Sequence, residues 1–467
     1  MSASNPPSEF ERFTEALNNL PSPSNIRFIH LQWLDFSSTL RSHVLPISHL
    51  LSLTKSNRYH GLSGLNKLLI DSSVAHYDRD KLLTRDQSYL LPDFSSLRQI
   101  PSLPHHAAIF CNFSEDISHR PTTSLSPPKI SPFCPRLPLQ NAIKEAAEMK
   151  LKILVGFEIE FTCPPTTTTT TSSESESRPA QLSSARNLAA NSMLDILSEI
   201  TDHLHHSGVA PVQHFQAEAT QDQFEIVTGP LPPLEAADAL ILTKEAIRRI
   251  CTGDKKREVS FYPGVGEMNG LHLNLSVVST DDKIKGGNGE YEGFLAGVFE
   301  NIDGLCAFGM ARRESYARTV VGGGAAGRFK AWGTQNREVC VRRKGRGFWE
   351  VRFLDHAAQV HLFLGALMFA GLDGVRRGAE LKLKDCTTDP GLISEDERRE
   401  RFGITEELPV SVDEASQALK RNSLLVGKMG EGLITAYLAV TAAYNKMLDE
   451  QGDIESQKRK EWLVARL

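Results

Sequence analysis

The stretch VGFEIEF, residues 155–161, constrains the fold more than any other part of the sequence. As a β-strand its side chains alternate between two faces, so its four apolar residues share one face while Glu158 and Glu160 share the other. Two carboxylates about 7 Å apart repel each other, and burying them requires a cation or a shared proton. The alternative is an edge strand whose acids stay in water.

A second acidic stretch, FQAEATQDQFEIV, carries Glu218 and Glu225 seven residues apart. On one flat strand this odd spacing would place the two carboxylates on opposite faces. A turn or bulge near residues 220–222 would let both point the same way, and Gln223 would then share a face with Glu225.

Two further apolar stretches place polar residues on one side only. In GLHLNLSV, His272, Asn274 and Ser276 alternate with leucines, and in FWEVRFLD, Glu350 and Arg352 alternate with apolar residues. Four strands of this kind predict a sheet with one apolar face and one polar face. The alternative is a set of separate strand edges, each solvated.

The polar face would gather five carboxylates and one imidazole, which cannot lie together as anions without cations. Hard divalent ions held by oxygen and one imidazole satisfy this requirement, so we expect two or more Mg²⁺ or Mn²⁺ ions. The six candidate metal ligands are Glu158, Glu160, Glu218, Glu225, His272 and Glu350.

Arginines accompany these acids at positions 318, 337, 342 and 352. Guanidinium groups bind phosphates and carboxylates in a bidentate manner, and divalent ions with an arginine clamp suit phosphoryl transfer. The alternative is that each arginine only pairs with an acid. The glycine-rich run at 322–327 lacks the Gly-Lys-Ser/Thr ending of a P-loop, and we interpret it as a flexible surface loop.

Composition narrows the class of protein. With 467 residues, 40% hydrophobic and 23% charged, the chain is typical of a soluble protein of two or three domains. A net charge of −5 argues against a nucleic-acid partner, and the lack of an apolar run of about 18 residues argues against a membrane span. Seven scattered cysteines and a start without a signal peptide predict a cytoplasmic protein.

The chain divides by composition. We expect a mobile tail with a short helix over 1–24, a small α+β domain over 25–118, a linker over 119–138 and a large domain over 139–467, with a disordered Thr/Ser insertion at 164–179. Hydrophobic periodicity predicts a hairpin over 26–47 and long helices over 185–206, 233–250, 293–310, 356–378 and 411–449.

In the same order along the chain, these stretches resemble the motifs of glutamine synthetases. VGFEIEF resembles the family's G-x-E-x-E-F strand, EATQDQFEI its E-x-A-P-G-Q-x-E segment and NGLHLNLS its N-G-x-G-M-H-x-H-x-S segment. SYARTVVG, NREVCVR and WEVRFLDHAAQVHLFLGALMFAGLDGV are similar to later segments, and LPVSVDEASQAL to one near the C-terminus. The match covers nearly the whole chain and is nearest to divergent fungal glutamine synthetase-like proteins.

The resemblance implies an α+β fold with an N-terminal β-grasp domain and a C-terminal catalytic domain, in which helices ring a curved antiparallel sheet. It implies a homo-oligomeric ring and a reaction in which ATP phosphorylates the γ-carboxylate of glutamate before an amine attacks the acyl phosphate. The resemblance implies that one metal ion is held by Glu160, Glu218 and Glu225, and a second by Glu158, His272 and Glu350. It implies that Arg318 and Arg352 bind the substrate and that Arg337 and Arg352 act in catalysis. It implies that the nucleotide is bound by Asn274, Ser276, Arg337 and Arg342.

The chain also departs from the family's pattern. The family's flap glutamate falls on Gly324, and no carboxylate lies between Thr319 and Lys330. Its ammonium-binding D-G-S-S segment aligns with residues 60–63, its substrate-binding Asn-Gly falls on 267–268, and its second histidine is Asn274. The metal and phosphate residues are therefore kept while those for ammonium are reduced.

The sequence thus predicts an ATP- and Mg²⁺- or Mn²⁺-dependent ligase that joins glutamate or a similar carboxylate to ammonia or a larger amine, with a bulkier or neutral amine preferred. The alternative is a glutamine synthetase-like scaffold or regulator without catalysis.

Overall fold

The computed structural model describes residues 7–63, 66, 69–70, 73–74, 87–100, 103–115, 128–166, 182–189, 192–219, 222–253, 255–264, 267–280, 289–319 and 327–467. Residues 119–127 of the expected linker, nearly all of the Thr/Ser insertion and the glycine-rich run up to residue 326 lie outside the described residues, so for these the predictions remain predictions. The rest of the expected linker is described, and its last residues belong to a helix that begins at Arg136.

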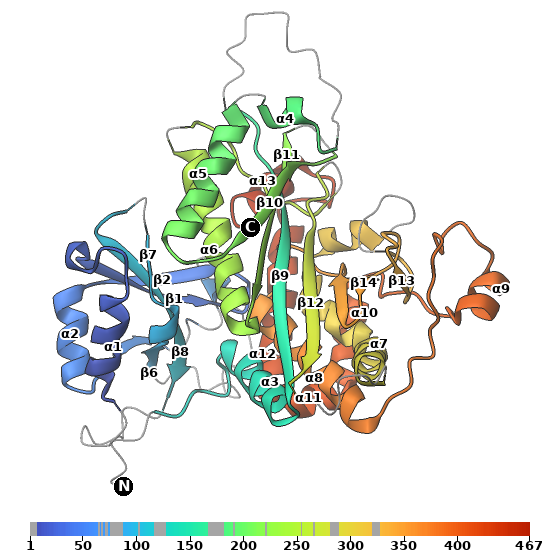
Figure 1. Ribbon diagram of the computed structural model, residues 1–467, viewed down its shortest axis with the longest axis horizontal. Coiled ribbons are helices and arrows are strands. Elements are labelled where there is room, and N and C mark those ends of the chain that lie inside the picture. The colour runs from blue at the N-terminus through green and yellow to red at the C-terminus, as the bar shows by residue number, and fades with distance from the viewer. Residues whose placement is uncertain are drawn as a thin grey trace, which may run out of the picture.

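The N-terminal part is built on a mixed sheet with strand order β2-β1-β8-β6-β3, and β7 pairs with β8 (Figure 1). Strand β1 runs parallel to β8, and the other pairs are antiparallel. Its elements are α1 (Glu9–Asn18), η1 (Pro23–Asn25), β1 (Phe28–Leu34), β2 (Leu40–Pro46), α2 (Ile47–Lys55), β3 (His60–Ser63), β6 (Gln87–Pro92), η3 (Phe94–Ser96), β7 (Arg98–Gln99) and β8 (His106–Ser114), with a separate pair β4 (Leu69–Ile70) and β5 (Ser73–Val74).

Helix α1 corrects the expectation of a mobile tail. The Ser8 side chain accepts a hydrogen bond from the Glu11 amide, and the Glu11 carboxylate accepts one from the Ser8 amide, which forms a capping box. Phe13 is fully buried, and its ring centroid lies 5.6 Å from that of Phe94. The helix therefore packs on the N-terminal sheet, because its apolar face is needed to cover that core.

The larger part contains a seven-stranded sheet of order β10-β11-β9-β12-β15-β14-β13. Only β13 and β14 run parallel. The strands are β9 (Leu151–Thr162), β10 (Val212–Ala217), β11 (Gln223–Leu231), β12 (Leu271–Ser279), β13 (Trp332–Thr334), β14 (Val341–Gly345) and β15 (Phe348–Val351). The four strands predicted to form one sheet are direct neighbours in it, which confirms the prediction.

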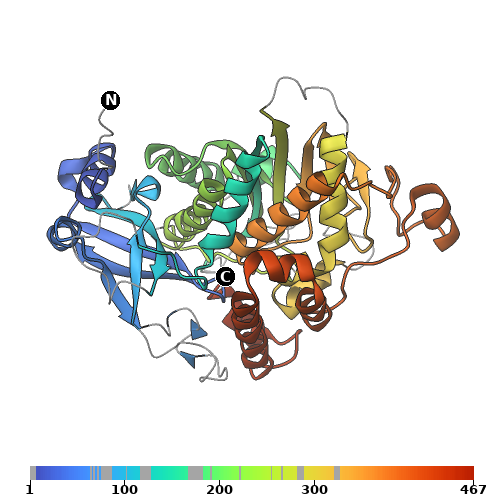
Figure 2. The same cartoon turned by 90° about the horizontal axis from the view of Figure 1, so that it is seen from below.

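Helices cover the apolar face of this sheet, and the N-terminal sheet lies to one side of it (Figures 1 and 2). The helical elements are α3 (Arg136–Glu148), α4 (Ala185–Ala189), α5 (Met193–His206), α6 (Pro233–Thr252), α7 (Gly289–Gly309), η6 (Arg313–Thr319), α8 (Val360–Arg377), α9 (Glu395–Glu397), η7 (Arg398–Phe402), α10 (Val412–Arg421), α11 (Ser423–Met429), α12 (Glu431–Asp449) and α13 (Gln457–Val464).

Two of the long helices expected from periodicity are interrupted. The one expected over 411–449 is three helices, because Asn422 caps α11 by accepting from the Leu425 amide at 2.9 Å and Gly430 takes a positive φ of 95°. The one expected over 185–206 breaks between α4 and α5, where Ser192 has φ 59°. At Asn422 a capping hydrogen bond interrupts the hydrophobic period, whereas at Ser192 the left-handed backbone does so without one.

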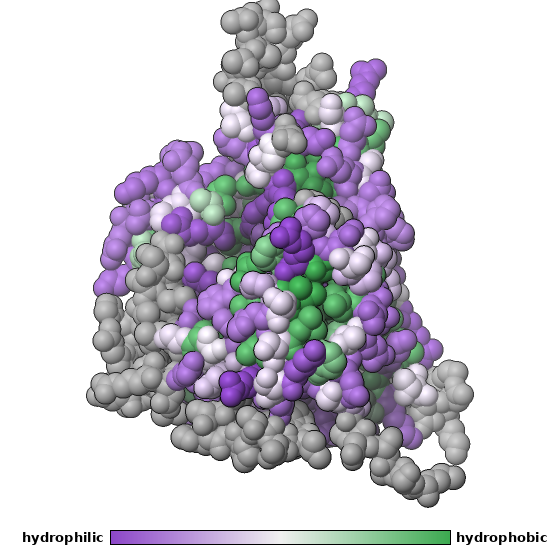
Figure 3. Space-filling model, turned by 90° about the vertical axis from the view of Figure 1, so that its left-hand side faces the viewer, coloured by the Kyte–Doolittle hydropathy of each residue, from purple (hydrophilic) through white to green (hydrophobic). Residues whose placement is uncertain are grey.

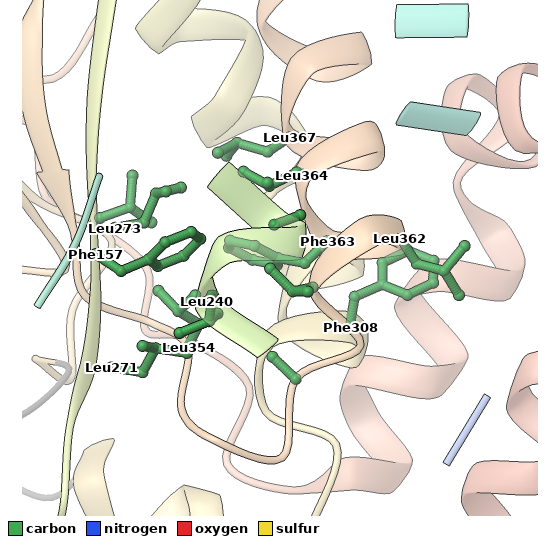
Figure 4. Packing of buried hydrophobic residues seen from close by; sticks show 14 of the residues in the cluster. Phe157, Leu240, Leu271, Leu273, Phe308, Leu354, Leu362, Phe363, Leu364 and Leu367 are labelled. Carbon is green, nitrogen blue, oxygen red and sulfur yellow. The ribbon is translucent and has the colours of Figure 1, made fainter. Parts of the chain in front are cut away.

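The core lies between the sheet and the helices behind it. Phe157 of β9 and Leu271 and Leu273 of β12 point toward Leu240 of α6 and the leucines of α8 (Figure 4). Burying a side chain of this size stabilises the fold by about 1.5–3 kcal/mol. Gly156 beside them has a steric role, since a Cβ there would lie 2.4 Å from the Thr228 carbonyl oxygen of β11.

A buried guanidinium joins the two parts of the molecule. Arg136 at the start of α3 donates to Asp93 of the N-terminal part at 2.7 Å and also pairs with Asp238 of α6. Asp238 in turn lies 2.9 Å from His361 Nε2 of α8. In the part of the chain that the structure describes, no single helix is long and apolar enough to cross a membrane, and α11 and α12 pass that test only together, as a pair bent by 103°.

Candidate active site

Strand register brings three predicted metal ligands together. Glu158 of β9 lies opposite His272 of β12, and Asn274 lies opposite Glu350 of β15. His272 Nδ1 is 3.3 Å from a Glu158 oxygen and 3.6 Å from a Glu350 oxygen. One ligand atom from each of the three residues lies within 4.8 Å of the others. We name Glu158, His272 and Glu350 the Glu158 cluster, and its donor set fits a divalent ion.

Cationic side chains surround the Glu158 cluster. Arg342 Nη1 donates to Glu350 Oε2 at 2.9 Å, and Arg352 donates to the other oxygen of Glu350. Each of these two arginines therefore pairs with an acid of the cluster. Lys344 Nζ donates to Glu158 Oε1 at 3.0 Å. Lys344 was not among the predicted site residues, although it follows Arg342 by two residues and so shares its face of β14.

Both carboxylates of the cluster favour the ionised form. Burial opposes the ionisation of Glu158, but the hydrogen bond and charge of His272, together with Lys344, lower its pKa below the usual value. Burial also opposes the ionisation of Glu350, but the charges of His272 and Arg352 lower its pKa. The cluster therefore presents anionic oxygens at neutral pH, as a hard cation requires.

The other three predicted ligands, Glu160, Glu218 and Glu225, form what we name the Glu160 group. The Gln216 amide donates to Glu218 at 2.7 Å and to Glu225 at 3.2 Å, so both carboxylates lie on one side of the β10–β11 hairpin. The chain reverses between them, because β10 pairs antiparallel with β11, and Asp222 at the start of the return has φ 55°. Among the described residues, only the Glu158 cluster brings three ligand atoms within 4.8 Å, so the Glu160 group is the more open of the two.

The Glu160 group is electrostatically unlike the Glu158 cluster. Glu160 accepts from the Gly270 amide at 2.7 Å and from Gln223 at 3.3 Å, and no described lysine or arginine forms an ion pair with any member of the group. Burial and the charges of neighbouring glutamates raise the pKa of Glu225 to about 9. Burial and the charge of Glu160 raise the pKa of Glu218 to about 7. This half of the face therefore holds protons that a divalent ion would replace.

Arg318 of η6 is 1% exposed and lies behind both sets of acids. It donates to the Leu354 carbonyl at 2.5 Å, and its Nη2 is 3.5 Å from His272 Nε2. A Cβ on Gly270 would lie 2.9 Å from Glu160 Oε1 and 3.0 Å from Arg318 Nη2, so a larger residue there would crowd both groups. Burial lowers the pKa of Arg318, with the charges of Asp355 and Glu160 opposing this.

The remaining predicted residues are less enclosed. Asn274 donates to Glu158 Oε1 at 2.9 Å, and Ser276 is half-buried further along β12. Arg337 is exposed, and its charge acts on Glu218. Glu267, at the position of the family's asparagine, pairs with Lys460 of α13 at 2.8 Å. Two glutamines also donate to acids of the Glu160 group: Gln216 to Glu225, and Gln223 to Glu160. Gln223 donates to Asn269 as well. Of these three residues, only Gln223 was identified from the sequence pattern.

Comparison with known proteins identifies the family. The model described as "Glutamine synthetase, catalytic domain" matches residues 132–458. This chain belongs to the glutamine synthetase family. The matched residues contain every predicted metal ligand and arginine, and the resemblance inferred from the motifs is confirmed.

Characterised relatives cover different shares of their own length. Protein fluG of Emericella nidulans is 28% identical over 94% of this chain and 49% of its own length. Gamma-glutamylpolyamine synthetase GlnA3 of Streptomyces coelicolor is 32% identical over 52% of this chain and 54% of its own. The chain thus spans about half the length of these two relatives. Type-1 glutamine synthetase 1 of Dictyostelium discoideum is 24% identical over 92% of this chain and 88% of its own.

Solved structures confirm the fold class. "GmaS/ADP complex-Conformation 1" superimposes with a TM-score of 0.75 at 21% identity, covering 97% of this chain and 99% of that one. "Crystal structure of novel glutamine synthase homolog" gives a TM-score of 0.74 at 22% identity, covering 95% and 99%. At these identities the likeness extends to the fold alone.

Proposed function

We propose that this protein is an ATP- and Mg²⁺- or Mn²⁺-dependent ligase that joins glutamate or a similar carboxylate to an amine larger than ammonia. The observation that carries the proposal is the single polar face on which β9, β11, β12 and β15 place four glutamates and His272, with Glu218 joining them from just after β10. Amide formation through an acyl phosphate needs a triphosphate held in line with a carboxylate, and this face supplies both anionic metal ligands and arginines.

We assign each residue of the polar face a role according to its position. The Glu158 cluster would hold one divalent ion and the Glu160 group another, and the ions would neutralise the triphosphate as its γ-phosphoryl group is transferred. Arg318 would bind the substrate carboxylate together with Arg352, and its burial without a carboxylate at hydrogen-bonding distance among the described residues supports this role. Arg342, Arg337, Asn274 and Ser276 would bind the nucleotide, as the family resemblance implies.

The amine preference rests on the sequence and on one relative. No carboxylate lies between Thr319 and Lys330, where the family carries the acid that attracts ammonium and assists its deprotonation. A relative sharing 32% identity over about half of this chain is named a gamma-glutamylpolyamine synthetase. Both support an amine that brings its own binding contacts rather than ammonia.

A scaffold or regulator without catalysis is the second candidate, and one observation favours it. Lys344, Arg342 and Arg352 already balance the charges of Glu158 and Glu350 without any ion. A protein that had lost catalysis could keep its fold through these pairs.

The deciding experiment measures ADP release with glutamate, Mg²⁺ and a panel of amines: ammonia, a short monoamine, a diamine and a polyamine. ADP formed only when acid and amine are both present, with the amide identified by mass spectrometry, supports the ligase. Glu350→Gln should abolish this signal, whereas Glu397→Gln, a change in α9 far along the chain, should leave it unchanged. No ADP with any amine would favour the scaffold.

A further inference from the structure

Lys344 of β14 occupies the position between the two carboxylates of the Glu158 cluster. Its Nζ is 3.0 Å from Glu158 Oε1, 3.8 Å from Glu350 Oε2 and 3.0 Å from Asn274 Oδ1. The side chain is 25% exposed. An ammonium so placed makes charge-assisted contacts to two of the three groups that would ligate a divalent ion.

Each carboxylate oxygen of the Glu158 cluster contacts a neighbouring side chain. Glu158 turns one oxygen toward His272 and the other toward Lys344, and Glu350 turns one toward His272 and the other toward Arg342. A divalent ion at the centre of the three ligands would lie within a few ångströms of the Lys344 ammonium. Two cations at that separation in a largely buried site repel each other.

We propose that Lys344 is a resident cation of the Glu158 cluster that competes with the divalent ion, so that an ion binds there only when this ammonium withdraws. The inference rests on the proposed function in taking the cluster as an ion site. It goes beyond that function by assigning control of ion loading to a residue outside the ligand set. Lys344 is thus a positioning residue rather than a catalytic one.

The Lys344 side chain can move away from the two carboxylates. Lys344 is a flexible four-carbon side chain, and its Nζ lies 5.5 Å from the ring centroid of Phe348 on the adjacent strand. Its partial exposure leaves room to move toward solvent or toward the phosphates of a bound nucleotide. The Glu160 group has no ion pair with a described lysine or arginine, so the two halves of the face should load in sequence, the Glu160 group first and the Glu158 cluster second.

The experiment titrates Mn²⁺ into the full-length protein without nucleotide, by calorimetry and by electron paramagnetic resonance of free Mn²⁺. Lys344→Met should bind the weaker of the two Mn²⁺ equivalents about tenfold more tightly than wild type, and Lys344→Arg, which keeps the charge, should not. The matched control is Lys428→Met, because Lys428 is 31% exposed and pairs with Glu145 at 2.8 Å outside the site. This control should leave both affinities unchanged.

A general folding defect cannot imitate the expected result, because it would weaken Mn²⁺ binding rather than strengthen it. Unchanged or weaker affinity in Lys344→Met overturns the competition, and Lys344→Gln repeats the test if the methionine variant is insoluble. Failure of the two proposals is distinguishable. Tighter Mn²⁺ binding without ADP release in the amine panel upholds the role of Lys344 and rejects the ligase, whereas ADP release with equal affinities does the reverse.

Discussion

Glu225 of β11 lies directly opposite Glu160 of β9 in the antiparallel pairing. Like charges at facing positions destabilise a sheet, and here both side chains lie on the polar face among other acids. No described lysine or arginine pairs with either one. The two glutamates therefore need protons or a divalent ion, and the first predictions follow from this need.

The first prediction concerns pH and chelation. Because Glu218 and Glu225 have pKa values raised to about 7 and about 9, protonation favours the folded state. Their contribution to stability is fully present below the usual value near 4.5 and is lost as pH rises through 7 and 9. In chelator, the melting temperature should therefore fall by several degrees between pH 6 and pH 9. Scanning calorimetry measures this directly.

Mn²⁺ supplies the control for that measurement. Bound to the folded state only, it should raise the melting temperature most at the high end of this range, where the carboxylates are ionised. A melting temperature at pH 8 that is the same in chelator and in Mn²⁺ would contradict a metal role for the Glu160 group.

The second prediction is that one substitution, Glu160→Gln, lowers metal binding and activity but raises the stability of the chelated protein. Glu160→Gln should reduce Mn²⁺ binding and ADP release at least about 100-fold. It should also stabilise the chelated protein by about 0.2–1 kcal/mol above pH 9, where Glu225 is ionised as well, because it removes one of two facing charges. Glu148→Gln in α3, where the side chain is 66% exposed, is the control for both readings. Loss of stability in the chelated Glu160 variant would show that the carboxylate is structural.

The third prediction concerns the amine. If the missing acid at position 324 limits ammonia use, Gly324→Glu should raise ammonia-dependent amide formation by about 10²–10⁴, the usual contribution of a general base. Turnover with the preferred larger amine should fall, because the new side chain takes up space. Wild-type turnover with ammonia above about 1 per second, a rate typical of enzymes, would refute this interpretation.

The fourth prediction is a homo-oligomeric ring, which the family resemblance implies. Seen from the side of the N-terminal part, the surface is mostly hydrophilic, but apolar residues gather near its middle (Figure 3). Association that covers this face would remove the apolar area from water. Sedimentation at micromolar concentration should give a mass of several chains, and a monomer would refute the prediction.

The fifth prediction tests the hydrophobic core behind the polar face of the sheet. Phe157→Ala should cost about 3–5 kcal/mol of unfolding free energy, because the ring is 1% exposed and faces the helices. Leu392→Ala, at a side chain that is 81% exposed, should change it by less than about 0.5 kcal/mol. Equal effects in urea denaturation would mean that β9 does not carry the core as described.

The sequence by itself determined the two-faced strands, since alternation along a strand is a local property with a period of two. It placed Glu158 with Glu160 and His272 with Asn274, and its motifs indicated the family that the comparison confirmed. It also indicated that a turn or bulge near residues 220–222 would let Glu218 and Glu225 point the same way, and the antiparallel pairing of β10 with β11 agrees with this. These features depend only on residues that are close together along the chain, so the sequence alone was enough to predict them.

Only the tertiary structure decided what balances the acids. Strand register sets Lys344 against Glu158, 186 positions away in the chain, and Gln216 against both Glu218 and Glu225. Periodicity also predicted one helix where Asn422 and Gly430 make three. Contacts between distant segments depend on register and packing, which no local pattern encodes, and these contacts divide the acids into a half balanced by cations and a half held by protons.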